Sequence, residues 1–150
     1  MSHTYKVKHH PTFTRQQMYD YIIQSDSDIS LIVGRLLTSL GFKSKLCGTL
    51  YLHAAIMYCY NTNNRVGIAG NAYRSVAELY DTTFSRVERS IRTAISICYF
   101  HGELSAFNIL AQAPIVEAKS PPTNSEFMCS VVNWLQLEKQ AGNIKDRDQM

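Results

Sequence analysis

Apolar residues recur with the period of an α-helix along most of the chain, and polar turns separate the apolar stretches. From Ile29 the apolar positions are 29, 32, 33, 36, 37 and 40, and Gly41 follows as a helix stop. The stretch from Leu46 to Tyr60 is apolar nearly all round, which is typical of a central, buried helix. These patterns predict helices rather than strands in the first half of the chain.

Further helices are predicted on either side of these two. A short helix fits residues 16–24, and Asp28 is a candidate N-cap for the helix that follows. Downstream, the periodicity predicts helices over residues 72–80, 84–100 and 104–110, and from residue 124 onward. Three prolines between residues 113 and 122 exclude regular helix there, and Thr123-x-x-Glu126 forms a capping box. We therefore expect an all-α domain of about six helices, in addition to the short helix at its N-terminal side.

The length and composition predict one folded domain. Of the 150 residues, 45% are hydrophobic and 18% are charged, a balance that excludes a wholly disordered chain. We expect the domain over residues 29–139, a partly flexible N-terminal extension over 1–28, and a flexible tail over 140–150. The sequence contains no apolar run long enough to span a membrane and no signal peptide, so we expect a cytoplasmic protein without membrane contact.

Charge, cysteines and motifs narrow the possible chemistry. Residues 1–100 carry 11 basic and 6 acidic side chains, which suits either a polyanionic partner or a soluble basic surface. The four cysteines show no C-x-x-C spacing and lie in apolar contexts, so they predict buried, reduced thiols rather than a zinc site. Because no catalytic or phosphate-binding motif is present, we expect a protein that is not an enzyme and needs no cofactor or metal.

Residues 84–100 separate apolar and cationic side chains onto opposite faces of one helix. At 100° per residue, one face carries Val87, Ile91, Ala94, Ile95 and Cys98. The opposite face carries Ser85, Arg89, Arg92 and Ser96, with Arg86 and Thr93 on one flank and Glu88 on the other. A shorter helix and a tight turn precede this segment, as in a helix-turn-helix unit whose second helix enters the major groove of DNA.

Two simpler interpretations of Glu88 remain open at this point. Ser85-x-x-Glu88 has the spacing of a capping box, so Glu88 could serve only to cap the helix. Glu88 and Arg92 also have the i,i+4 spacing of a surface ion pair, which contributes about 0.2–0.5 kcal/mol to a helix.

Residues 81–95, DTTFSRVERSIRTAI, closely resemble the recognition-helix segment of the stage-zero sporulation protein A family of transcription regulators. Residues 40–52 resemble the family's Gly-x-Pro…Lys-Gly-Tyr-Leu-Tyr-Leu segment, residues 102–104 its Gly-Asn-Ile, and residues 122–127 its Pro-Thr-Asn-Ser-Glu-Phe. The resemblance covers about residues 29–139. It implies the family's six-helix effector domain, which binds double-stranded DNA through a helix-turn-helix.

The resemblance also implies roles for individual residues. The family's base-reading Glu and two Arg fall on Glu88, Arg89 and Arg92. Its contacts to DNA phosphates fall on Ser85 and Arg86, and Thr93, where well-known members have His, is expected to join them. The family reads boxes similar to TGTCGAA through the helix that begins near Phe84. Its fifth helix and the following loop, here about 103–116, contact the housekeeping sigma subunit of RNA polymerase.

Two departures from the family pattern shape the functional hypothesis. Residues 1–28 are too short for a phosphoacceptor receiver domain, so we expect no control by aspartyl phosphorylation in cis. Residues 111–114, Ala-Gln-Ala-Pro, replace a Phe-Gly-Tyr-Thr run in the polymerase-contacting region, so DNA binding carries over better than activation.

The sequence therefore predicts a sequence-specific DNA-binding transcription regulator. We expect it to be a monomer when free and to pair on tandem DNA sites. The alternative is a receiver-less interaction protein that modulates a full-length regulator or RNA polymerase through residues 1–28 and 111–122.

Overall fold

The computed structural model describes residues 14–24, 28–62 and 68–145, and this part of the chain contains helices and no strand. The helices are α2 (Arg15–Ile22), α3 (Ile29–Ser39), α4 (Cys47–Thr62), α5 (Ile68–Leu79), α6 (Phe84–His101), α7 (Ala106–Ala111) and α8 (Asn124–Gln140). The predicted all-α class is confirmed. The domain boundaries at residues 29 and 139 stay a prediction.

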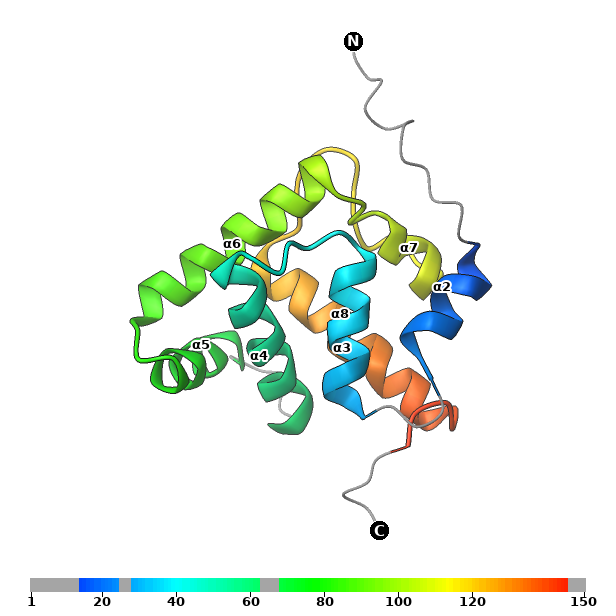
Figure 1. Cartoon of the computed structure of the whole chain (residues 1–150), viewed down its shortest axis with the longest axis horizontal. Coiled ribbons are helices and arrows are strands. Elements are labelled where there is room, and N and C mark those ends of the chain that lie inside the picture. Colours follow the sequence, from blue (N-terminus) through cyan, green and yellow to red (C-terminus); the bar gives the residue numbers. More distant parts are fainter. Residues whose placement is uncertain (1–13, 25–27, 63–67, 146–150) are drawn as a thin grey trace.

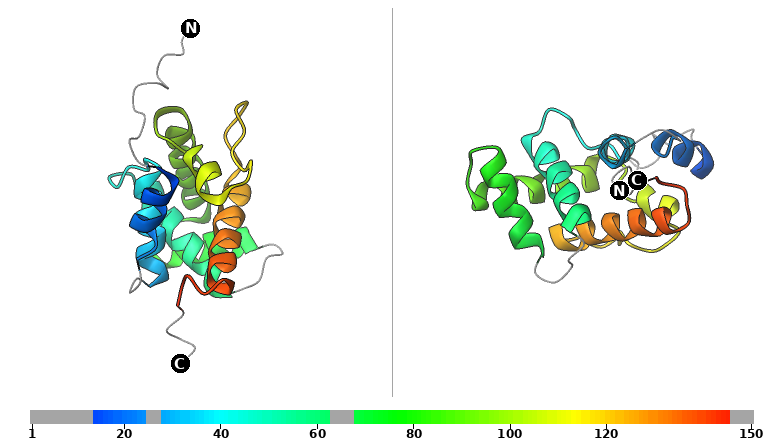
Figure 2. Two further views of the ribbon diagram at one scale, coloured as in Figure 1. Left: turned by 90° about the vertical axis from the view of Figure 1, so that its right-hand side faces the viewer. Right: turned by 90° about the horizontal axis from the view of Figure 1, so that it is seen from below.

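Helix α4 occupies the centre of the fold and packs against α3, α5, α6 and α8 (Figure 1). Helices α5 and α6 lie together at one end of the molecule, and α2 and α7 lie at the opposite end (Figures 1 and 2). The sequence of α4 explains this position, because a helix that is apolar nearly all round must be covered on several sides. The fold therefore leaves one long side of α6 without a helical neighbour.

Aromatic rings join the elements on the other side of the core. Phe127 of α8 lies 5.7 Å from Phe42 and 5.9 Å from Phe107, measured between ring centroids. Phe107 in turn lies 6.1 Å from Trp134 in an edge-to-face arrangement. Such offset and T-shaped contacts are the favoured geometries of aromatic pairs. They tie α7 and α8 to the loop between α3 and α4.

Local capping chemistry sets several helix ends as the sequence predicts. The Asp28 side chain accepts a hydrogen bond from the Leu31 amide at the start of α3. Gly41 follows that helix at a φ of 92°, a left-handed conformation that glycine adopts without strain. Thr123 and Glu126 form the predicted capping box of α8. These ends are confirmed because they depend on residues only three or four positions apart.

Several helices differ from their predicted bounds, and α2 ends at Ile22 rather than at residue 24. The helix predicted over 72–80 begins at Ile68. Gly70 and Asn71 are poor helix formers, so helix propensity does not predict this first turn. The helix predicted over 104–110 begins at Ala106, after a tight turn in which the Ala106 amide donates to the Glu103 carbonyl.

The prediction that all four thiols are buried is wrong for two of them. Cys59 and Cys98 lie in the core, whereas Cys47 and Cys129 are exposed. An apolar neighbourhood in sequence misleads here, because Cys47 is the first residue of α4 and Cys129 lies on the outer side of α8.

Helix α2 and the residues after α8 pack onto the same end of the domain. The Tyr19 hydroxyl donates a hydrogen bond to Glu138 of α8. The Asn143 amide donates to the same carboxylate over 2.9 Å, and Ile144 is buried. The segments at both ends of the described chain thus meet at Glu138. No helix of the described residues is long and apolar enough to cross a membrane.

Candidate nucleic-acid interface

A tight turn joins α5 to α6 and aims the second helix away from the first. Asp81 has a φ of 54°, and the Thr82 amide donates to the Ala77 carbonyl over 2.9 Å. Asp is one of the few residues other than glycine that adopt this conformation readily. The ring of Tyr73 in α5 meets the ring of Phe84 edge-on, with the centroids 5.3 Å apart. This turn and ring contact give the two helices the helix-turn-helix arrangement that the sequence predicts.

The apolar face of α6 is buried as predicted. Its buried residues are Val87, Ile91, Ala94, Ile95 and Cys98. The Cys98 thiol also donates to the Leu40 carbonyl over 3.0 Å, which anchors the end of α6 to the end of α3. Because this face is in the core, the opposite face points outward over the first turns of the helix.

The predicted DNA-contacting residues lie on the outward side of α6. Ser85, Arg86, Arg89, Arg92 and Thr93 are all exposed. The Glu88 side chain is 31% exposed and lies at the edge of this surface. We refer to these six residues as the α6 face. The structure thus brings together all six residues within three turns of one helix.

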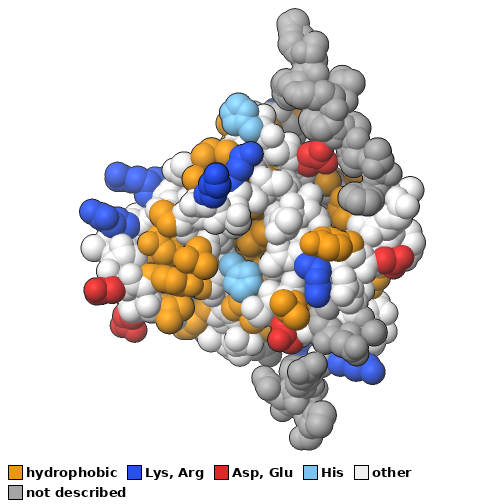
Figure 3. Space-filling view, in the orientation of Figure 1, with side chains coloured by type: hydrophobic (Ala, Val, Ile, Leu, Met, Phe, Trp, Pro, Cys, Tyr) orange, Lys and Arg blue, Asp and Glu red, His pale blue; other side chains and the backbone are white. Residues whose placement is uncertain are grey.

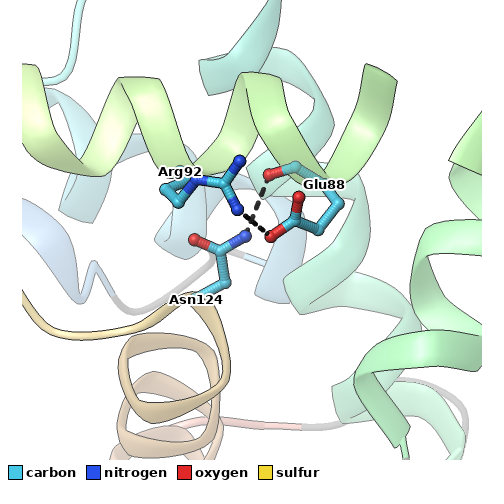
Figure 4. A network of polar contacts seen from close by, with 3 residues as sticks. All are labelled: Glu88, Arg92 and Asn124. Atoms are coloured by element: carbon cyan, nitrogen blue, oxygen red, sulfur yellow. Dashed lines mark hydrogen bonds and ion pairs between the residues drawn. The ribbon is translucent and has the colours of Figure 1, made fainter. Parts of the chain in front are cut away.

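Glu88 and Arg92 are paired with each other in the free protein. The Arg92 guanidinium donates to the Glu88 carboxylate over 2.5 Å, which confirms the ion-pair interpretation (Figure 4). The capping interpretation is wrong. Thr83 rather than Ser85 is the N-cap of α6 and accepts from the Arg86 amide, so Ser85 and Glu88 both lie inside the helix and do not form a capping box.

Sequence reasoning missed a residue beneath the α6 face. Asn124, the first residue of α8, is 6% exposed, and its Nδ2 donates to the Glu88 carbonyl oxygen over 3.0 Å (Figure 4). Burial raises the pKa of Tyr73 nearby, and a hydrogen bond from Asn124 opposes this effect. The one available signal is that Asn124 belongs to the Pro-Thr-Asn-Ser-Glu-Phe stretch that resembles the sporulation family.

The start of α4 approaches the middle of α6 very closely. A Cβ atom at Gly48 would lie 2.1 Å from the Ser90 carbonyl oxygen, so glycine is required for this contact. The loop that leads into α4 carries the exposed residues Lys43 and Lys45. Figure 3 shows Lys and Arg side chains along the outer edge of α6 and over this loop, whereas acidic side chains lie near the α5–α6 turn.

The chemistry of this surface is electrostatic. It offers guanidinium donors and one carboxylate on a single exposed helix face, the side-chain types that bind phosphates and base edges. Among the described residues, no group of three His, Cys, Asp or Glu side chains is arranged to hold a metal ion.

Comparison with known families agrees with this geometry. Residues 33–135 of the 150 match the family model described as the C-terminal part of the sporulation initiation factor Spo0A. The matched residues run from α3 into α8 and include the whole helix-turn-helix unit and Asn124. Helix α2 lies outside them.

Proposed function

Because the chain belongs to the Spo0A C-terminal family of helical DNA-binding domains, which act in transcription regulation, we propose that its α6 face reads a specific DNA sequence. The family is one of DNA-binding domains rather than of enzymes. The proposed target is a box similar to TGTCGAA in double-stranded DNA, with residues 29–139 as the binding unit.

One observation carries this proposal: the exposed face of a helix whose other face is buried carries three arginines and one carboxylate. An exposed helix at the end of a helix-turn-helix unit can enter the major groove, where each base pair presents a distinct set of donors and acceptors. Arginine suits the O6 and N7 atoms of guanine, and a carboxylate suits the N4 amine of cytosine.

The six residues divide into two proposed roles. Arg89 and Arg92 lie one turn apart on the centre of the face, and Glu88 flanks them, so these three are proposed to reach base edges. Arg86 lies about 60° from Arg89 around the helix and closer to its N-terminus. We assign Arg86, Ser85 and Thr93 to the sugar-phosphate wall of the groove.

Base reading by Glu88 and Arg92 requires their mutual ion pair to open. The cost is small, because Arg92 is 56% exposed and a surface ion pair contributes only about 0–1 kcal/mol.

The test compares Arg89→Ala with Arg86→Ala on a TGTCGAA-type duplex and on a scrambled duplex, by fluorescence anisotropy at several salt concentrations. Arg89→Ala is expected to weaken binding to the box by about 1–3 kcal/mol and to affect the scrambled duplex little. Arg86→Ala is expected to weaken both duplexes alike and to lower the salt dependence by about one unit.

A matched control removes the same charge elsewhere. Lys145 is exposed beyond the end of α8, so Lys145→Ala should leave both affinities close to those of the parent protein. If Arg89→Ala lowers both affinities equally, α6 is only an electrostatic surface and the base-reading assignment is wrong.

A second candidate function is favoured by the position of α2. The Arg15 guanidinium donates to the Ile109 carbonyl over 3.2 Å and to the Leu110 carbonyl over 3.1 Å, at the end of α7. In the sporulation family, the helix and loop that correspond to α7 and the residues after it contact the polymerase sigma subunit. A helix bound there supports an interaction protein that modulates a full-length regulator or RNA polymerase.

The second candidate has its own test. Binding of the purified chain to the housekeeping sigma subunit is measured by calorimetry, with and without Arg15→Ala. Binding that changes with Arg15→Ala but not with Arg89→Ala supports the interaction function. An absence of binding in every case excludes the sigma subunit as the partner.

A further inference from the structure

Asn124 is the only buried polar or charged side chain in the part of the chain that the structure describes. Every other buried side chain of the described residues is apolar or aromatic, or belongs to cysteine. Burying an amide costs free energy unless its polar atoms find partners. Asn124 donates to the Glu88 carbonyl and interacts with Tyr73, while its Oδ1 has no hydrogen-bond partner among the described residues. A stabilising role alone accounts poorly for a polar residue at this position.

The hydrogen bond joins two helices at a defined point. Asn124 is the first residue of α8, and the Thr123 cap fixes the backbone at this end of the helix. The position from which the Asn124 side chain extends is therefore well defined. It meets α6 at the backbone of Glu88, directly below the Glu88–Arg92 ion pair (Figure 4). The Asn124 amide must present its Nδ2 to the Glu88 carbonyl, because a carbonyl oxygen accepts hydrogen bonds and only Nδ2 can donate one.

A hydrogen bond restricts rotation of α6 in a way that apolar packing does not. The contacts of Val87 and Ile91 with the core are non-directional and tolerate a small rotation of the helix. The bond from Asn124 weakens steeply as its angle departs from linearity. Side chains that read bases must be held within about 0.5 Å of their productive positions, and rotation of α6 is amplified at the tips of long side chains.

We infer that Asn124 is a positioning residue that sets the rotation of α6, and thereby the sequence selectivity of Glu88 and Arg92, without touching DNA itself. The inference rests on the proposed function, since it concerns how the α6 face discriminates between DNA sequences. Non-specific binding does not depend on this alignment, because a phosphate contact tolerates displacement better than a base contact.

The test measures the ratio of the dissociation constants for the scrambled and TGTCGAA-type duplexes. Asn124→Leu keeps roughly the shape of the side chain and removes the donor without placing a charge beside Glu88. Asn124→Ala removes the side chain altogether. Both variants are expected to bind the box about tenfold more weakly, the loss that one ordinary hydrogen bond corresponds to, and to bind the scrambled duplex within about twofold of the parent.

Two controls separate positioning from a loss of stability. Ser125→Ala changes the exposed neighbour of Asn124 and should leave the ratio unchanged. Ile144→Ala removes a buried side chain at the far end of α8 and should lower the urea midpoint without changing the ratio. All titrations are made at a temperature at which circular dichroism shows each variant fully folded.

The possible results distinguish the inference about Asn124 from the proposed function. A lower ratio in both Asn124 variants, with both controls unchanged, supports the inference. An unchanged ratio in the Asn124 variants overturns it while leaving the proposed function intact. A parent protein that does not prefer the TGTCGAA-type duplex refutes the proposed function, and the inference fails with it.

Discussion

Replacing Gly48 by alanine tests how closely α4 and α6 approach each other. The added Cβ would lie 2.1 Å from the Ser90 carbonyl oxygen, 2.7 Å from the Ser90 carbonyl carbon and 3.0 Å from the Ala94 Cβ. The first two are backbone atoms of a helix, which cannot swing aside as a flexible side chain does. Helix α4 must therefore move away from α6, or α6 must bend.

The expected cost is the difference between two opposing effects. Overpacking of a core costs about 1–3 kcal/mol, and a contact this short belongs at the upper end of that range. Alanine stabilises a helix interior by about 1 kcal/mol relative to glycine, and because Gly48 is only the second residue of α4 this gain offsets at most part of the cost. The net loss of unfolding free energy is therefore about 2 kcal/mol, equivalent to a fall in melting temperature of about 4–8 °C.

Gly70 provides a matched control in α5. A Cβ at Gly70 would meet no atom within 4 Å, so Gly70→Ala carries the helix-propensity gain without a clash. Urea denaturation followed by circular dichroism should show Gly70→Ala more stable than the parent by about 0.5–1 kcal/mol and Gly48→Ala less stable. If Gly48→Ala is as stable as Gly70→Ala, α4 and α6 do not approach each other as closely as the structure shows.

Three further predictions concern the core, the thiols and the assembly. Ile91 is fully buried in α6, so Ile91→Ala should cost about 2–5 kcal/mol in a urea titration, and a loss near zero would mean that the faces of α6 are reversed. At pH 8 a thiol reagent should modify Cys47 and Cys129 quickly, because both are exposed. Cys59 and Cys98 should react only on unfolding, because burial raises their pKa to about 11 and about 12 and suppresses the reactive thiolate; rapid modification of all four would contradict this. Light scattering at micromolar concentration without DNA should show a monomer, and a stable dimer would favour the interaction function instead.

The sequence alone determined which segments form helices and which face of α6 is buried. The caps at Asp28 and Thr123 and the apolar period through Val87 and Ile91 are local signals, and all of them appear in the structure as expected. Local signals suffice because a helix is made of hydrogen bonds between residues four positions apart. The same period places the six candidate residues on one side of α6, whereas their assignment as DNA contacts came from the resemblance to the sporulation family.

Only the tertiary structure decided which distant residues support that face. Asn124 meets Glu88 across 36 positions, and Gly48 meets Ser90 across 42, distances in sequence that no helical period encodes. The exposure of Cys47 also depends on where the start of α4 lies relative to its neighbours. Such contacts are set by how several helices pack together at once. The periodicity of a helix gives the direction of each side chain but not the identity of the residue that it meets.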